Sequence, residues 1–123
     1  MSNEKFIFED LRVYHGALKL SVELTKLATK FPHDYSRIQN QLIGAAISVP
    51  LNLAEGSGRE SDKDKKNFYR ISRSSIFELV PLIDIIYELG LIGSDKRDEI
   101  RHEVAELSRI VSTLMKNKVS QKS

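Results

Sequence analysis

Apolar residues recur at intervals of three and four along most of this chain, and this spacing constrains the fold more than any other feature. In the segment that ends at Phe31-Pro32, one row falls on a single helical face: Val13, Ala17, Leu20, Leu24, Leu27 and Phe31. A second row beside it widens the apolar arc: Leu11, Tyr14, Leu18 and Val22. The last segment carries a heptad seam: Ile100, Val104, Leu107, Val111 and Leu114. No stretch alternates apolar and polar residues as a strand would, so the sequence predicts an all-α fold.

Proline, glycine and capping residues divide the chain into helices. Phe31-Pro32 ends the first helix, because the residue before a proline is disfavoured in helical geometry. Gly56 and Gly58 are expected to adopt the left-handed conformation that closes the second helix, and Ser61 or Asp62 to cap the third. The predicted helices cover, within a few residues, 9–31, 35–56, 61–90 and 94–117. Short connections make consecutive helices antiparallel, so we expect a single domain, residues 1–123, that forms an up-down-up-down four-helix bundle.

The third helix carries both an apolar face and a basic stripe. The expected inner face consists of Phe68, Ile71, Ser75, Leu79, Leu82 and Ile86. The basic residues advance by three, four and three, with one more cation just before the helix: Arg59, then Lys63, Lys66, Arg70 and Arg73. Tyr69 is expected beside this stripe. Two interpretations stay open, an ordinary solvated face or a surface that contacts phosphates.

The chain offers few residues for catalysis or metal binding. It contains no cysteine, and its three histidines, His15, His33 and His102, lack the spacing of a metal site. The segment Gly56-Ser57-Gly58-Arg59 resembles a phosphate-cradling loop, but it lacks the preceding strand and the Lys-Ser/Thr pair of a P-loop. We therefore interpret this segment as the C-cap of one helix followed by the N-cap of the next. We therefore predict no catalytic residue, no metal and no cofactor.

Charge and hydropathy limit where the protein can reside and which kinds of partner it can bind. The 19 basic and 17 acidic residues give a net charge of +2, which permits nucleic-acid contact through a local patch without requiring it. The longest apolar stretch, residues 42–54, is interrupted by small and polar residues and falls short of the roughly 20 that span a bilayer. With no signal-peptide pattern at the N-terminus, we expect a cytoplasmic protein without a membrane partner.

One run resembles the signature of a known family. Residues 41–56, QLIGAAISVPLNLAEG, are followed by Gly58-Arg59, and similar family positions are matched by Phe8-x-x-Leu11, by Phe31-Pro32 and by Ser74-Ser75-Ile76-x-Glu78-Leu79. This pattern resembles the bacterial four-helix-bundle proteins encoded by intervening sequences within 23S ribosomal RNA genes, also called S23 ribosomal proteins. The motif residues are expected to be structural: Gln41, Pro50, Asn52, Glu55, Gly56 and Gly58.

The resemblance implies more than a fold. It implies a ring-like homopentamer and an association with ribosomal RNA, and related bundles are accessory partners of reverse transcriptases in diversity-generating retroelements. One departure is Ile43-Gly44, where the family usually has one or two arginines. This change removes positive charge from the second helix.

These observations lead to one hypothesis and one alternative. The hypothesis is a non-enzymatic homo-oligomer that engages RNA, or an RNA-handling protein, through its basic surface. Self-association is expected because the first two helices carry more apolar arc than one small bundle covers. The alternative is a protein-binding scaffold or accessory factor, for example a partner of a reverse transcriptase.

Overall fold

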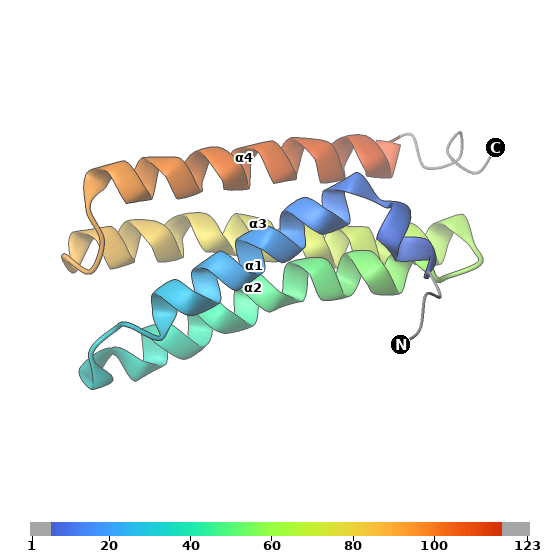
Figure 1. The fold of residues 1–123 in the computed structure, drawn as a ribbon. Helices are drawn as coiled ribbons and strands as arrows, with labels where there is room; N and C mark the ends of the chain where they lie inside the picture. Colours follow the sequence, from blue (N-terminus) through green and yellow to red (C-terminus); the bar gives the residue numbers. More distant parts are fainter. Residues whose placement is uncertain (1–5, 117–123) are drawn as a thin grey trace.

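The computed structural model describes residues 6–116 and contains four long helices. Two short 3-10 turns, η1 (Ile7–Asp10) and η2 (His33–Tyr35), accompany α1 (Arg12–Ala28), α2 (Ser36–Ser57), α3 (Asp62–Glu88) and α4 (Ser94–Lys116). The helices lie side by side and each runs opposite to the one before it (Figure 1). No strand occurs in residues 6–116. The all-α four-helix prediction is confirmed.

The first helix is shorter than the 9–31 that the sequence predicted. Residues 7–10 form η1 instead, in which the Glu9 carboxylate accepts the backbone N–H of Phe6 at 2.7 Å, and Leu11 is extended (φ −80°, ψ 114°). At the other end, the Thr29 hydroxyl donates to the carbonyl of Lys26 at 2.6 Å. A hydroxyl that donates to a backbone carbonyl in this way replaces a backbone N–H donor at the end of a helix. Phe31 therefore lies beyond α1, although it is still buried.

The left-handed glycine caps predicted for α2 are wrong. Gly58 closes α2 with a φ of −87°, and Gly90, after α3, is the only residue of the described chain with a positive φ (78°). A side chain instead supplies a hydrogen bond to a free carbonyl at the end of α2. The ammonium group of Lys65 donates to the carbonyl of Ser57 at 3.0 Å. The Ser61 cap of α3 is confirmed, since its hydroxyl accepts the backbone N–H of Asp64 at 3.1 Å.

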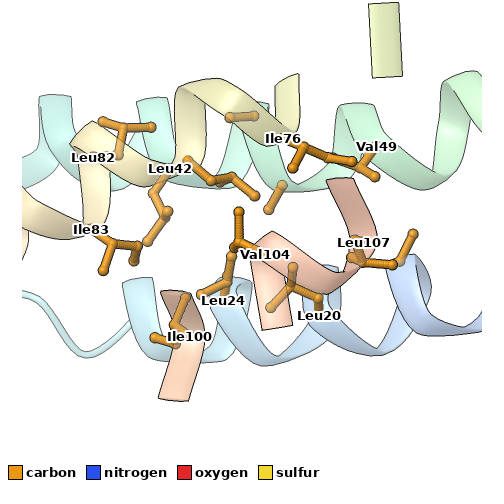
Figure 2. Packing of buried hydrophobic residues seen from close by; sticks show 14 of the residues in the cluster. Leu20, Leu24, Leu42, Val49, Ile76, Leu82, Ile83, Ile100, Val104 and Leu107 are labelled. Carbon is orange, nitrogen blue, oxygen red and sulfur yellow. The ribbon is translucent and has the colours of Figure 1, made fainter. Parts of the chain in front are cut away.

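All four helices contribute to one hydrophobic core. The heptad seam of α4 is buried throughout, and so is most of the first row of α1. In Figure 2, Leu20 and Leu24 of α1, Leu42 and Val49 of α2, and residues of α3 and α4 point into the shared interior. Burial of this kind is worth roughly 1.5 to 3 kcal/mol for each large apolar side chain. The core therefore accounts for most of the stability of the bundle.

The inner face of α3 is shifted from the predicted one. Tyr69 is 3% exposed and Ser72 is fully buried, whereas Ile71, expected inside, is 41% exposed. The cause is Gly56 on α2, because a Cβ there would lie 2.8 Å from a ring carbon of Tyr69. The missing side chain leaves room for the Tyr69 ring and for the Cβ of Phe68, which is half-buried. Tyr69 adjoins the basic stripe on α3, as expected, but it is a core residue whose ring is not exposed there.

The four helices are not equally packed. α2 has the most extensive contacts with α3, and of the neighbouring helices that touch, α1 and α4 have the least extensive contact. Between α1 and α4 lies a groove of about 510 Å³ whose lining includes Gly16, Leu20, Leu107 and Ile110. Among residues 6–116, no helix is long and apolar enough to cross a bilayer.

Candidate functional site

The basic residues of α3 form one continuous face. At about 100° per residue, Lys63, Lys66, Arg70 and Arg73 lie within an arc of about 80°. Lys63 and Arg70 are exposed and the other two are half-buried. Within the described part of the chain, none of the four forms an ion pair with a carboxylate. Their charge is therefore available to an external anion. These four residues are called the basic face below.

The basic face borders α4 and ends before the acidic end of α3. The Arg73 guanidinium reaches the Ser112 hydroxyl of α4 at 3.4 Å, so this edge faces the α3–α4 seam. Further along α3, both Asp84 oxygens accept from Arg101 at 2.9 Å, which neutralises that carboxylate. The positive potential is thus concentrated on the first half of α3.

Arg59 differs from the other predicted cations. Its guanidinium pairs with the Glu55 carboxylate and also lies 4.6 Å from the centre of the Phe68 ring. The pair offsets its charge, and the ring contact fixes its position near the end of α2. Arg59 therefore contributes less free charge than the basic face does.

Two motif residues of α2 take part in contacts with α3. Asn52 donates to the carbonyl of Ser48 at 2.8 Å and to its hydroxyl at 3.0 Å. The same hydroxyl accepts from Ser75 of α3 at 2.8 Å, which extends the network across the helix pair. Near the other end of α2, Gln41 donates to Glu78 of α3 at 3.0 Å. These bonds favour a structural role for both residues.

The remaining motif residues fix the packing of α2. Pro50 is buried within the helix, and Gly56 makes room for Tyr69. Gly44, at the departure from the family pattern, is exposed, and a Cβ added there would meet nothing within 4 Å. A side chain at position 44 would therefore point into open space, and α2 presents no cation at that position.

A cluster of carboxylates lies where α1 and α4 meet. Glu103 of α4 faces Glu23 of α1, and one Glu103 oxygen is buried without a hydrogen-bond partner. Burial raises the pKa of Glu103, as do the charges of Glu23 and Glu99, while Lys19 opposes them. Lys96 bridges the two helices through Glu23 at 3.3 Å. No sequence pattern pointed to this cluster, because its members belong to helices at opposite ends of the chain.

Glu103→Gln is expected to raise the melting temperature at neutral pH. The folded-state pKa of Glu103 lies above its unfolded value, so the folded state loses stability as the pH rises through that interval. The neutral amide of the variant removes this loss of stability. The difference in melting temperature between variant and wild type should therefore vanish below about pH 4, where Glu103 is protonated in both the folded and the unfolded state. Thermal unfolding followed by circular dichroism at the two pH values measures it. The control is Glu106→Gln, an exposed carboxylate on the same groove, and an equal gain there would contradict the assignment.

Among residues 6–116, no group of three or more His, Asp or Glu side chains could hold a metal ion. His15 is held by the carbonyl of Glu9 at 2.7 Å, at the start of the bundle. His33 and His102 are exposed on other elements.

Sequence reasoning missed one exposed aromatic residue. Phe77 is 59% exposed and lies four residues after Arg73, in line with the basic face. The sequence could have indicated this position, because Phe77 continues the spacing of three and four residues that relates the cations of the basic face. Tyr69 was considered there instead, and it is buried.

Comparison with protein families gives one informative match. A family model described as 23S rRNA-intervening sequence protein matches residues 9–113, which include all four helices up to the last turn of α4. A comparison with curated proteins gives no match.

Proposed function

The chain belongs to the 23S rRNA-intervening sequence protein family, and from this premise we propose that it is a non-enzymatic, self-associating bundle that binds RNA. The observation that carries the RNA-binding part is the basic face of α3, whose four cations have no carboxylate partner in the described chain. Unpaired cations on a rigid helix attract phosphates and release the counterions that surround a nucleic acid. A merely solvated face usually alternates the two signs of charge.

Self-association is supported by apolar side chains that the single bundle leaves uncovered. On α1, the second apolar row ends in the exposed Leu18 and Val22, and on α2 Ile47 and Leu51 are exposed, Leu51 by 64%. Gln39 donates to the carbonyl of Ala28 at 2.9 Å, which sets the register of the antiparallel pair. In this register Ile47 lies level with Leu18 and Val22. We propose that this surface, the α1–α2 apolar surface, joins the copies of a homopentamer.

Assembly would strengthen a weak RNA contact. Each copy of the bundle repeats the basic face, so a long RNA could engage several faces at once, and linked contacts add by avidity. The basic face belongs to α3 and borders α4, whereas the apolar surface belongs to α1 and α2. One surface can therefore join copies while the other remains accessible.

Salt dependence tests the RNA-binding proposal. Changing Lys66, Arg70 and Arg73 to serine should lower the slope of log affinity against log salt by about 2 to 3, because each phosphate contact contributes about 0.7 to 0.9. Affinity for a labelled 23S ribosomal RNA fragment, measured by fluorescence anisotropy over a salt series, gives the slope. Circular dichroism checks that the variant remains helical.

The matched control removes three positive charges elsewhere. Lys26, Lys30 and Arg37 are exposed near the α1–α2 connection, and their replacement by serine changes the net charge equally. This variant should keep most of the slope. If wild-type protein shows no salt-sensitive RNA binding at low ionic strength, or both triple variants behave alike, the basic face is not the RNA site, and a protein-binding scaffold is the better description.

A further inference from the structure

Phe77 occupies an unusual position for a solvent-exposed aromatic residue. Among the Phe and Tyr side chains of the four helices, as the structure describes them, only that of Phe77 is largely exposed, at 59%. Of the other exposed apolar residues of α3, Ile71 and Ile85 lie about 120° and about 80° around the helix from it, and Pro81 lies one turn after it. Phe77 is therefore separated from the core and from the two exposed isoleucines of its helix.

Cations precede Phe77 on its face of α3. Arg73 lies one turn before it on the same face, close enough for side-chain contact, and Arg70 lies two turns before it. Within the arc of about 80° from Lys63 to Phe77 there is no acidic residue. The nearest carboxylate further along this side of α3 is Asp84, which Arg101 neutralises. An aromatic ring thus ends a row of four unpaired positive charges.

This arrangement matches the two requirements for binding unpaired nucleotides. Cations attract the phosphate backbone, and an exposed aromatic ring offers a surface on which a base can stack. A fully paired helix cannot use such a ring in the same way, because its bases are already stacked on each other. The ring therefore distinguishes single-stranded from duplex RNA, whereas the cations alone do not.

We propose that Phe77 stacks on an unpaired base while the basic face holds the adjoining phosphates, so that the preferred ligand is a single-stranded or looped segment of RNA. The inference rests on the proposed RNA-binding function and specifies its ligand. The stacking contact is repeated in every copy of the bundle, and it discriminates by strandedness more than by sequence, because every base has an aromatic surface.

The test compares two RNA probes on the 123-residue chain. The probes are a short fluorescein-labelled oligoadenylate and a blunt RNA duplex with the same number of phosphates. Phe77→Leu keeps an apolar side chain but removes the ring, so affinity for the oligoadenylate should fall about 5- to 150-fold. Duplex affinity and the salt slope should stay near wild type. Ile85→Ala, at an exposed apolar position off the row, should leave both affinities unchanged.

A spectroscopic readout separates stacking from simple contact. The chain contains no tryptophan, so Phe77→Trp introduces a single reporter at this position. This variant should bind oligoadenylate at least as well as wild type, and its fluorescence should be quenched on binding. The duplex should quench it much less.

The outcomes distinguish this inference from the function on which it rests. If neither probe binds wild-type protein in a salt-sensitive manner, both proposals fail. If wild type binds but Phe77→Leu leaves oligoadenylate affinity intact, or the indole fluorescence of the Phe77→Trp variant does not respond, the stacking inference fails and the basic face stands. If Phe77→Leu instead lowers the mass of the assembly in light scattering, Phe77 belongs to a protein contact, which also overturns the inference.

Discussion

Replacement of Gly56 by alanine is expected to destabilise the bundle by about 1 to 3 kcal/mol, although alanine is the better helix former. The added Cβ would lie 2.8 Å from one ring carbon of Tyr69 and 3.0 Å from the Cβ of Phe68. Real side chains do not pack so closely, so the buried ring must move. Since the ring is surrounded by core residues, this movement disturbs the contact between α2 and α3. Urea denaturation at a fixed protomer concentration measures the loss.

Gly44→Ala is the matched control for Gly56→Ala. Both glycines lie in α2, but a Cβ at position 44 meets nothing within 4 Å. The control should therefore stabilise the protein by about 0.5 to 1 kcal/mol, through helix propensity alone. The difference between the two variants isolates the packing effect. If Gly56→Ala were as stable as Gly44→Ala, the close packing of Tyr69 on Gly56 would be wrong.

Charging the α1–α2 apolar surface is expected to dissociate the assembly completely. Wild-type protein should show, by light scattering at micromolar concentration, a mass five times that of the 14.0 kDa chain. The double variant Leu18→Lys, Leu51→Lys should scatter as a monomer, because an interface cannot bury unpaired ammonium groups without a cost of several kcal/mol for each. Both positions are exposed in the single bundle, so the variant should remain folded.

Ile85→Lys is the control for this double variant, because Ile85 is exposed on α3, outside the α1–α2 surface. It should keep the mass of wild type. A wild-type protein of monomer mass would refute self-association itself. Dissociation by Ile85→Lys with retention of mass in the double variant would place the interface on α3 instead.

Much of the fold could be predicted because the relevant interactions are local. Helical hydrogen bonds join residues four apart, so periodic apolar residues identified the four helices, and the α4 seam was located residue by residue. The Ser61 cap was predictable for the same reason, since its partner Asp64 is three residues away. The spacing of the basic face also depends only on the helical repeat, and the structure places all four residues on one side of α3.

Other features depend on contacts between distant segments. Adjacent residues of a helix lie about 100° apart, and α3 packs on both α2 and α4, so periodicity alone left two neighbouring rows possible. Gly56, on a different helix, decided that Tyr69 would be buried and that Ile71 would be exposed. The facing carboxylates Glu23 and Glu103 are likewise 80 positions apart in the chain and meet only through packing.

The sequence by itself determined the helices, their order and the row of cations, because each of these follows from the regular geometry of a single helix. The tertiary structure decided which apolar residues the bundle covers and which it leaves at the surface. Leu18 and Val22 share the periodicity of the buried residues of α1, yet they stay exposed because the neighbouring helices cover only one side of α1. Phe77 lies outside the core for the same geometric reason, and its exposure beside unpaired cations is the property that the packing of α3 against α2 and α4 created.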